Sequence, residues 1–154
     1  MSSIILLRML IGWHFLYEGV VKVYNPDWSA FSYLATAQGP FDFLFSPLAQ
    51  NSMINVVDTL NVLALLFAGI SLILGVFEKK AALVAMVLLA MYYLAHPPFP
   101  GLQQLNVEGN YWFVNKNLIE LVACAVLFQN PTGHILGLRS LWKNNKKPTK
   151  IEKA

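Results

Sequence analysis

The sequence predicts an all-α membrane protein: a polytopic four-helix bundle with short interfacial helices in its first extracytoplasmic loop. Of its 154 residues, 56% are hydrophobic and only 12% are charged, which is about half the charge of an ordinary soluble domain. The positive mean hydropathy, +0.52, is concentrated in apolar runs of bilayer length that alternate with short polar or aromatic stretches. This alternation indicates several membrane spans within one domain.

Four apolar runs are candidate spans, although the third is short on its own, since a crossing takes roughly 17 to 25 residues per helix. We place them at residues 4–24, 52–77, 81–96 and 111–128. Only residues 78–80 join the second run to the third, so these two spans must form an antiparallel hairpin. The proline-rich run 97–100 follows the third span and is expected to stop its helix.

The connection between the first two spans, residues 25–51, is rich in aromatic side chains and carries only two acidic residues. Such a segment is typical of short helices that lie in the membrane interface. Gly39, Pro40 and Pro47 are expected to separate those helices from one another.

Lysine and arginine residues gather on one side of the predicted bundle. Lys79 and Lys80 occupy the turn after the second span, and the tail beyond the fourth span adds Arg139, Lys143, Lys146, Lys147, Lys150 and Lys153. The positive-inside rule therefore places both termini and this turn in the cytoplasm, with the two aromatic loops outside. We divide the chain into a four-span membrane domain, residues 1–133, and a basic cytoplasmic tail, residues 134–154.

Several classes of function have no support in the sequence. The single cysteine, Cys124, permits no disulfide within the chain and no thiolate metal cluster. The chain contains no Walker loop, dinucleotide fingerprint or Ser/His/Asp set, so neither a metal nor a flavin site is predicted. The net charge of +3 comes from a tail beside a membrane domain, where it sets orientation and contacts anionic lipid rather than nucleic acid.

Ionisable side chains inside the spans are the candidate site residues, because a charge at the bilayer centre costs roughly 2.5 to 3.5 kcal/mol. Such a charge needs a partner or a wet cavity. Four polar residues of the first span fall within one sector of about 120° at helical periodicity: Arg8, His14, Glu18 and Lys22. This polar stripe is expected to face the interior of the bundle.

The other spans carry polar residues at matching depths. Glu18, Asp58 and Glu120 each lie roughly 10 Å inside the outer boundary of their spans, since a helix rises about 1.5 Å per residue. We predict that seven groups converge on one cavity in the outer half of the bundle: Glu18, Asp58, Glu120, Lys22, Lys116, Asn61 and His96. His14, near mid-membrane, would then form a proton relay with Glu18 one turn away.

Plainer interpretations remain open for the same charges. Glu18 with Lys22, and Lys116 with Glu120, are spaced i and i+4 and can form ion pairs that only fix the register of the helices. Lys116 lies in a first helical turn, where the helix dipole disfavours a cation. It is therefore expected to have an acidic partner or an anionic or quinone-like ligand.

Three further residues also have ordinary explanations. Arg8, near the inner boundary, is expected to snorkel to the interface. His14 could be a neutral imidazole bonded to a neighbour, and His96 could be only a helix-end residue beside the proline-rich run.

Segments along nearly the whole chain resemble the DoxX/DoxD group of small four-span membrane proteins. In the first span these are Arg8, Gly12, Phe15, Leu16, Gly19 and Lys22. Elsewhere they are residues 72–75, the YYLAHPPF stretch at 92–99, GNYWFVNKNLIE at 109–120 and residues 133–138. The resemblance implies a four-helix fold in the cytoplasmic (inner) membrane of a bacterium or archaeon.

The resemblance also implies a redox-linked role, because the best-known members of the group are small subunits of a thiosulfate-oxidising enzyme that reduces quinone. On this hypothesis the chain is a non-autonomous subunit of a quinone-linked oxidoreductase, and a membrane or extracytoplasmic partner protein supplies the electrons. Lys22 and Lys116 would bond the carbonyl oxygens of a quinone, and Glu18, Asp58 or Glu120 would exchange protons. His14, Asn61 and His96 complete the binding set.

Two other functions use the same residues. In a small-solute carrier the charges would form the transport site, although four helices leave little room for alternating access without a dimer. In a non-catalytic scaffold or assembly factor the ion pairs would fix the register and the aromatic loops would dock a partner. A homo-oligomer is compatible with all three.

Overall fold

The computed structural model describes residues 2–102, 111–138 and 140, and these fold into helices and turns. The long helices are α1 (Ser2–Tyr24), α4 (Ile54–Leu74), α5 (Glu78–Ala95) and α6 (Lys116–Gln129). Between α1 and α4 lie the short helices α2 (Phe31–Ala35), α3 (Asp42–Phe45) and the 3-10 helix η1 (Ser46–Ala49). The described part of the chain contains no strand, only an isolated bridge between Tyr111 and Val114. The predicted all-α class is therefore confirmed.

Two of the long helices are long and apolar enough to cross a bilayer. The most apolar windows of α1 and α4 have mean hydropathies of 1.5 and 2.1, and only 28% of each window is buried. The central helix of a soluble protein would be mostly buried, so these exposed apolar faces suit contact with lipid. Helix α6 has 14 residues and spans about 21 Å, less than the roughly 30 Å hydrocarbon core. A crossing by α5 and α6 stays a prediction.

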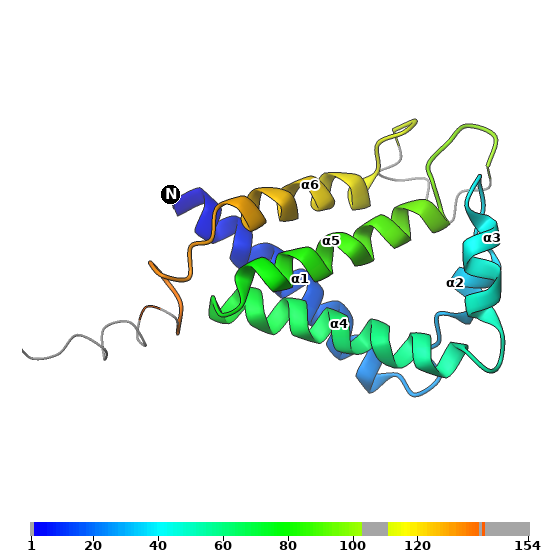
Figure 1. Ribbon diagram of the computed structural model, residues 1–154, viewed down its shortest axis with the longest axis horizontal. Helices are drawn as coiled ribbons and strands as arrows, with labels where there is room; N and C mark the ends of the chain where they lie inside the picture. Colours follow the sequence, from blue (N-terminus) through cyan, green and yellow to red (C-terminus); the bar gives the residue numbers. More distant parts are fainter. Residues whose placement is uncertain (1, 103–110, 139, 141–154) are drawn as a thin grey trace, which may run out of the picture.

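The long helices pack in chain order, with α1 on α4, α4 on α5 and α5 on α6, whereas α1 and α6 are in much smaller contact (Figure 1). Glycines allow the closest approach, between α1 and α4. A Cβ on Gly12 would meet Ile73, one on Gly19 would meet Leu66, and one on Gly69 would meet the backbone of Leu16. Small residues at such contacts let two helix backbones come together. The bundle is therefore tight on the α4 side and loose between α1 and α6.

The turn between α4 and α5 differs from the predicted one. Gly75 ends α4 in the left-handed conformation (φ 67°), and Phe77 adopts a second positive φ of 54°. These two residues reverse the chain, so Glu78 already lies in the first turn of α5. The antiparallel hairpin is as predicted, but the assignment of residues 78–80 as the turn was wrong.

Helix α6 begins five residues later than predicted, at Lys116. Before it, Trp112 has a left-handed backbone (φ 63°) within a tight turn closed by hydrogen bonds between Tyr111 and Val114. The side chain of Asn115 then accepts a hydrogen bond from Leu118 N at 3.0 Å and caps the helix. Capping by an asparagine fixes where a helix starts, and this local feature outweighed the apolar run.

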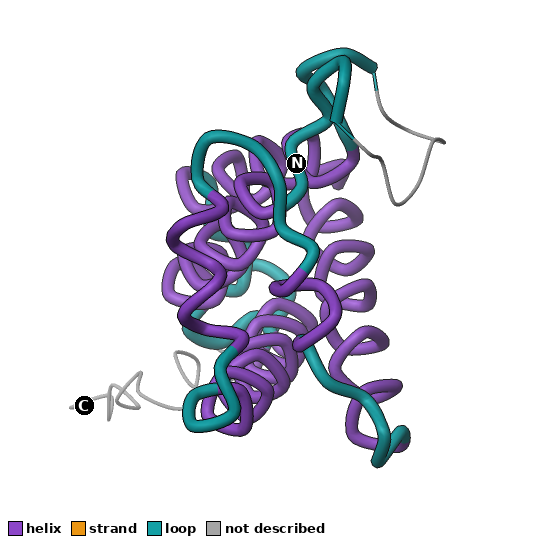
Figure 2. Tube along the Cα trace, turned by 90° about the vertical axis from the view of Figure 1, so that its right-hand side faces the viewer, coloured by secondary structure: helices purple, strands orange, loops and turns teal. Residues whose placement is uncertain are grey.

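The short helices form a cap over the end of the bundle where α1 and α5 finish and α4 starts. Figure 2 views the molecule from that end, with the short helices and loops in front of the long ones. Leu34, Phe45 and Ala49 of the cap pack with Ala95 of α5 in a second apolar cluster. Short helices in this loop were predicted, and Gly39, at φ 93°, separates two of them.

Candidate functional site

Four ionisable residues lie at the loose contact between α1 and α6, which we call the α1–α6 seam: His14, Glu18, Lys116 and Glu120. His14 Nδ1 lies 3.9 Å from Glu120 Oε1, so the two helices meet through an acid and an imidazole. The His14 side chain is 46% exposed and that of Glu18 is 48% exposed. The seam is therefore polar and open to the surface.

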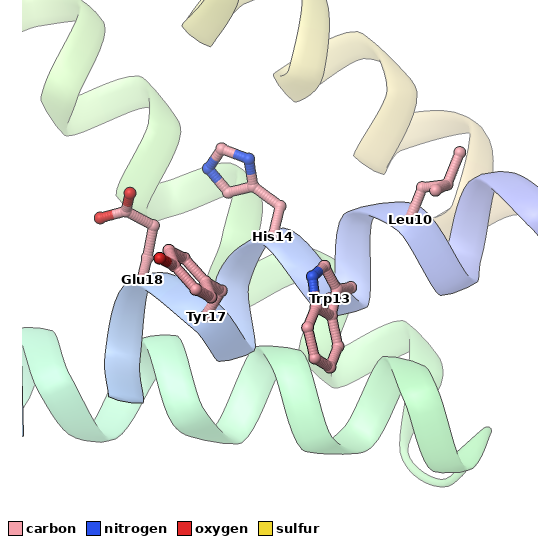
Figure 3. A pocket seen from close by; sticks show the side chains of 5 residues that line it. All are labelled: Leu10, Trp13, His14, Tyr17 and Glu18. Atoms are coloured by element: carbon pink, nitrogen blue, oxygen red, sulfur yellow. The ribbon is translucent and has the colours of Figure 1, made fainter. Parts of the chain in front are cut away.

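A shallow hollow of about 280 Å³ lies beside these residues on α1, lined by Leu10, Trp13, His14, Tyr17 and Glu18. Figure 3 shows His14 and Glu18 extending from the same side of α1, while Trp13 extends from another side. The hollow thus joins two ionisable groups to two aromatic rings. All five lining residues belong to α1, and Trp13 and Tyr17 are largely exposed, so the hollow is an open groove on one helix.

Within α1, Glu18 and Lys22 form an ion pair, with 2.6 Å between Oε2 and Nζ. The ammonium group also lies 5.2 Å from the centre of the Trp28 ring. The ion pair predicted for Glu18 and Lys22 is therefore present. Because both charges belong to one helix, they neutralise each other within α1.

Lys116 is exposed in the first turn of α6. The expected ion pair with Glu120 is not found, because Glu120 turns toward His14 instead and its side chain is only 16% exposed. Among the described residues Lys116 has no hydrogen bond or ion pair, although its charge acts on both Glu18 and Glu120. Lys116 is therefore an exposed cation at the start of α6.

Asp58 does not join the seam. Its Oδ1 accepts a hydrogen bond from the backbone N of Ala30 at 2.8 Å, immediately before α2 begins at Phe31. A carboxylate that accepts from a backbone N–H at a helix start satisfies one of the unpaired donors there. The structure therefore places Asp58 as an anchor of the cap.

His96 also lies in the cap, at the end of α5. Its Nε2 is 2.8 Å from the carbonyl oxygen of Tyr33, and because a carbonyl only accepts, Nε2 carries the hydrogen. The Tyr33 ring packs against the imidazole with 4.2 Å between centroids. Burial raises the pKa of the Tyr33 phenol, which keeps it protonated as the donor to Tyr92 O at 2.9 Å.

Asn61 faces a residue that the sequence did not single out as a site residue, Tyr92. The distance from Asn61 Nδ2 to the Tyr92 phenol oxygen is 2.6 Å. Asn61 therefore joins α4 to α5, and Tyr92 in turn contacts the cap, where Tyr33 donates to its backbone oxygen. Tyr92 lies four residues before His96, on the same helix face. This spacing is the sequence feature that could have identified Tyr92 as a candidate.

At the opposite end of the bundle, Arg8 forms a second polar cluster with Glu78, which we call the Arg8–Glu78 junction. Arg8 is only 1% exposed, and its Nη1 lies 3.3 Å from Glu78 Oε2 and 3.1 Å from Thr132 Oγ1. Its Nη2 donates to the carbonyl oxygen of Leu136. The expectation that Arg8 snorkels was wrong, because buried acceptors from two later segments surround the guanidinium.

Glu78 completes the Arg8–Glu78 junction from its other side. Its carboxylate accepts from Thr132 N at 2.8 Å and from Gly133 N at 2.6 Å. A Cβ on Gly133 would collide with the carbonyl oxygen of Gly75, so only glycine fits. Sequence reasoning missed Glu78 and Thr132 because the partners of the carboxylate are mostly backbone N–H groups, which leave no side-chain pattern.

One comparison with known proteins gives a match. A family model described as DoxX matches residues 3–97, which includes α1, α4 and α5 with the Glu18–Lys22 and Asn61–Tyr92 pairs. The match ends before α6, so it does not include Lys116 or Glu120. No curated protein matches the chain, and no solved structure matches it.

Proposed function

Because the chain belongs to the DoxX family of membrane proteins, we propose that it is the membrane subunit of a redox-linked complex. Its α1–α6 seam would bind a small membrane-soluble molecule of the quinone class. The observation that carries this proposal is the gathering of His14, Glu18, Lys116 and Glu120 at a loose, exposed contact between two helices. An exposed polar seam on a bundle of apolar helices is costly in hydrocarbon unless something polar fills it.

The seam residues suit a quinone. Lys116 is exposed and without an ion pair among the described residues, so its ammonium is free to donate to a carbonyl oxygen. Trp13 and Tyr17 supply aromatic walls in the adjoining hollow. A bound quinone would supply the capacity to take up electrons and protons, and a partner protein would supply the electrons.

The acids of the seam take the proton-handling role in this proposal. Glu120 and His14 are 3.9 Å apart, close enough to share a proton through a small shift or one water. Glu18 is half exposed and paired with Lys22. In this proposal its carboxylate stays ionised until a ligand displaces the lysine. Asp58 and His96 hold the cap and are not assigned to proton exchange, and Asn61 contributes through Tyr92.

The proposal includes the predicted topology. Helix α5 packs along the apolar α4, and α6 packs along α5, which supports four spans in the cytoplasmic (inner) membrane. Both termini and Lys79 with Lys80 would face the cytoplasm, and the cap would face outward. The boundary between a membrane domain, residues 1–133, and a basic tail, residues 134–154, is part of this proposal; residues 139 and 141–154 lie outside the described part of the chain.

The test uses the full chain in lipid nanodiscs with decylubiquinone as the probe. Quenching of tryptophan fluorescence reports binding, because Trp13 lines the hollow. Lys116→Gln and Glu120→Gln are expected to weaken binding, whereas Lys79→Gln, at the other end of the bundle, is the control. No saturable binding by the wild-type protein, or equal binding by all three variants, would overturn the proposal.

A scaffold function is the second candidate, and the Arg8–Glu78 junction favours it. This cluster ties α1, the start of α5 and the segment after α6 together, as expected of a rigid platform for a partner. The double variant Glu18→Lys/Lys22→Glu distinguishes a quinone-binding subunit from a scaffold. It keeps an ion pair but moves each charge by one helical turn. Retained quinone-coupled activity in the assembled complex would favour the scaffold.

A further inference from the structure

The pair formed by Asn61 of α4 and Tyr92 of α5 lies next to the α1–α6 seam but belongs to neither of its helices. Their side chains are joined at 2.6 Å. Asn61 lies one turn before Leu65 of α4, which packs against Gly19 of α1, so the pair lies near the level of Glu18. The phenol also sits at the level where α6 begins, since the next residue, Tyr93, donates to Phe113 O at 2.7 Å. The pair therefore forms the α4–α5 side of the same region.

The hydrogen-bond inventory of this pair leaves a donor unused. With Asn61 Nδ2 donating, the phenol oxygen is the acceptor, and the phenol hydrogen has no acceptor among the described residues. The alternative orientation exchanges the amide oxygen and nitrogen of Asn61. The phenol then donates to Oδ1, and the two hydrogens on Nδ2 are left without this partner. Asn61 Oδ1 has no partner in the described part of the chain as it stands. In either orientation a partly buried donor has no acceptor within the described residues, and leaving such a donor unpaired is unfavourable.

The pair is also held in position. Tyr33 donates to the backbone oxygen of Tyr92 at 2.9 Å, and the two rings meet edge to face with 5.9 Å between centroids. A donor fixed by its neighbours loses little freedom when a ligand binds, so its hydrogen bond contributes more to affinity.

Resting on the quinone site proposed above, we propose that the Asn61–Tyr92 pair donates a hydrogen bond to a carbonyl oxygen of the molecule bound in the α1–α6 seam. A neutral donor suits an uncharged carbonyl, so the pair would bond one carbonyl oxygen of a quinone while Lys116 bonds the other. Lys22 is already occupied by Glu18 at 2.6 Å. The ligand class is therefore a neutral carbonyl compound, and Tyr92 is a binding residue that Asn61 positions.

The experiment compares Tyr92→Phe and Asn61→Leu with the matched control Tyr93→Phe, all in nanodiscs with decylubiquinone. Tyr93 is the adjacent tyrosine, and its hydroxyl bonds to Phe113 outside the pair. Affinity is expected to fall about 3-fold to 10-fold for Tyr92→Phe, as for the loss of one hydrogen bond, and to stay unchanged for Tyr93→Phe. Difference infrared spectra should show one quinone carbonyl band shifted to lower frequency in the wild type and released in Tyr92→Phe and in Asn61→Leu.

The outcomes separate this inference from the function on which it rests. Absence of saturable binding by the wild-type protein would overturn the proposed function and this inference together. Wild-type binding that depends on Lys116 but is unaffected by Tyr92→Phe, with no change in the carbonyl band, would overturn this inference alone. A released carbonyl band in Tyr92→Phe supports it even where the affinity changes little, because a purely structural tyrosine would not move that band.

Discussion

The two charged clusters of this protein sit at opposite ends of the bundle and are built in opposite ways. In the Arg8–Glu78 junction both charges are buried, at 1% and 4% side-chain exposure, and backbone groups supply much of the remaining bonding. In the α1–α6 seam His14 and Glu18 are about half exposed and Lys116 lacks an ion pair among the described residues. Most of the bonding capacity of the Arg8–Glu78 junction is used inside the fold, and Arg8 Nε is its one buried atom without a partner among the described residues. Buried, paired charges hold a fold together, whereas exposed charges are available to a ligand.

The largest expected effect is on the Arg8–Glu78 junction. Arg8→Ala leaves the Glu78 carboxylate buried without its cation, and breaking such a pair typically costs about 3–5 kcal/mol. We expect the free energy of unfolding in nanodiscs, measured by denaturant titration, to fall by that amount. Lys79→Ala, one residue beyond Glu78 but exposed, is the control. An Arg8→Ala protein as stable as the wild type would contradict a stabilising role for the junction.

Gly133→Ala is expected to have the next largest effect on stability. The new Cβ would collide with the carbonyl oxygen of Gly75 and with the Glu78 carboxylate, so the junction must open. Overpacking of a close contact costs about 1–3 kcal/mol. Gly101→Ala is the control for steric collision, because a Cβ at Gly101 would meet nothing within 4 Å. The φ of 91° at Gly101 adds backbone strain of its own.

A change at the cap is expected to have an intermediate effect. Asp58→Ala removes the acceptor of Ala30 N, and a hydrogen bond to a charged group contributes about 1.5–3 kcal/mol at most, less where water replaces it. We expect loss of about 1 kcal/mol and faster amide hydrogen exchange at residues 30–35, with α1 and α4 unchanged. Thr59→Ala, the neighbouring residue whose hydroxyl bonds only to its own helix at Asn55 O, should leave that exchange unaffected.

The smallest effect on stability is expected in the seam. Glu18→Gln removes an ion pair whose acid is half exposed, and such pairs contribute about 0–1 kcal/mol. The same variant should nevertheless reduce decylubiquinone binding in the fluorescence assay. If Glu18→Gln lowered the free energy of unfolding by several kcal/mol and left binding intact, the seam would have a structural role and not a ligand-binding one.

Sequence patterning was a good guide to the elements that depend on hydrophobicity. The long helices, the hairpin after Gly75 and the short helices between α1 and α4 follow from apolar periodicity and from glycine and proline. The start of α6 did not, because Asn115 and the left-handed Trp112 set it locally. Hydropathy averages over many residues and is insensitive to a single cap.

The candidate site could be predicted only for contacts between regular helices. The stripe of His14, Glu18 and Lys22 was found from helical spacing, and the structure brings Glu120 to it. Asp58 lies at a comparable depth but bonds to the folded-back cap at Ala30. Arg8 finds acceptors in an irregular segment near Thr132. No periodicity reports on how an irregular segment folds back onto a helix.

The bond between Arg8 and Thr132 has a consequence for how the chain is made. These partners are 124 positions apart, and a ribosome adding about 5–20 residues per second needs roughly 6 to 25 s to cover that interval. During that time the arginine of the first helix has yet to meet this acceptor, and the carbonyl of Leu136 follows four residues later. Nascent chains halted before Thr132 should therefore be the forms most readily captured by membrane chaperones and quality-control proteases.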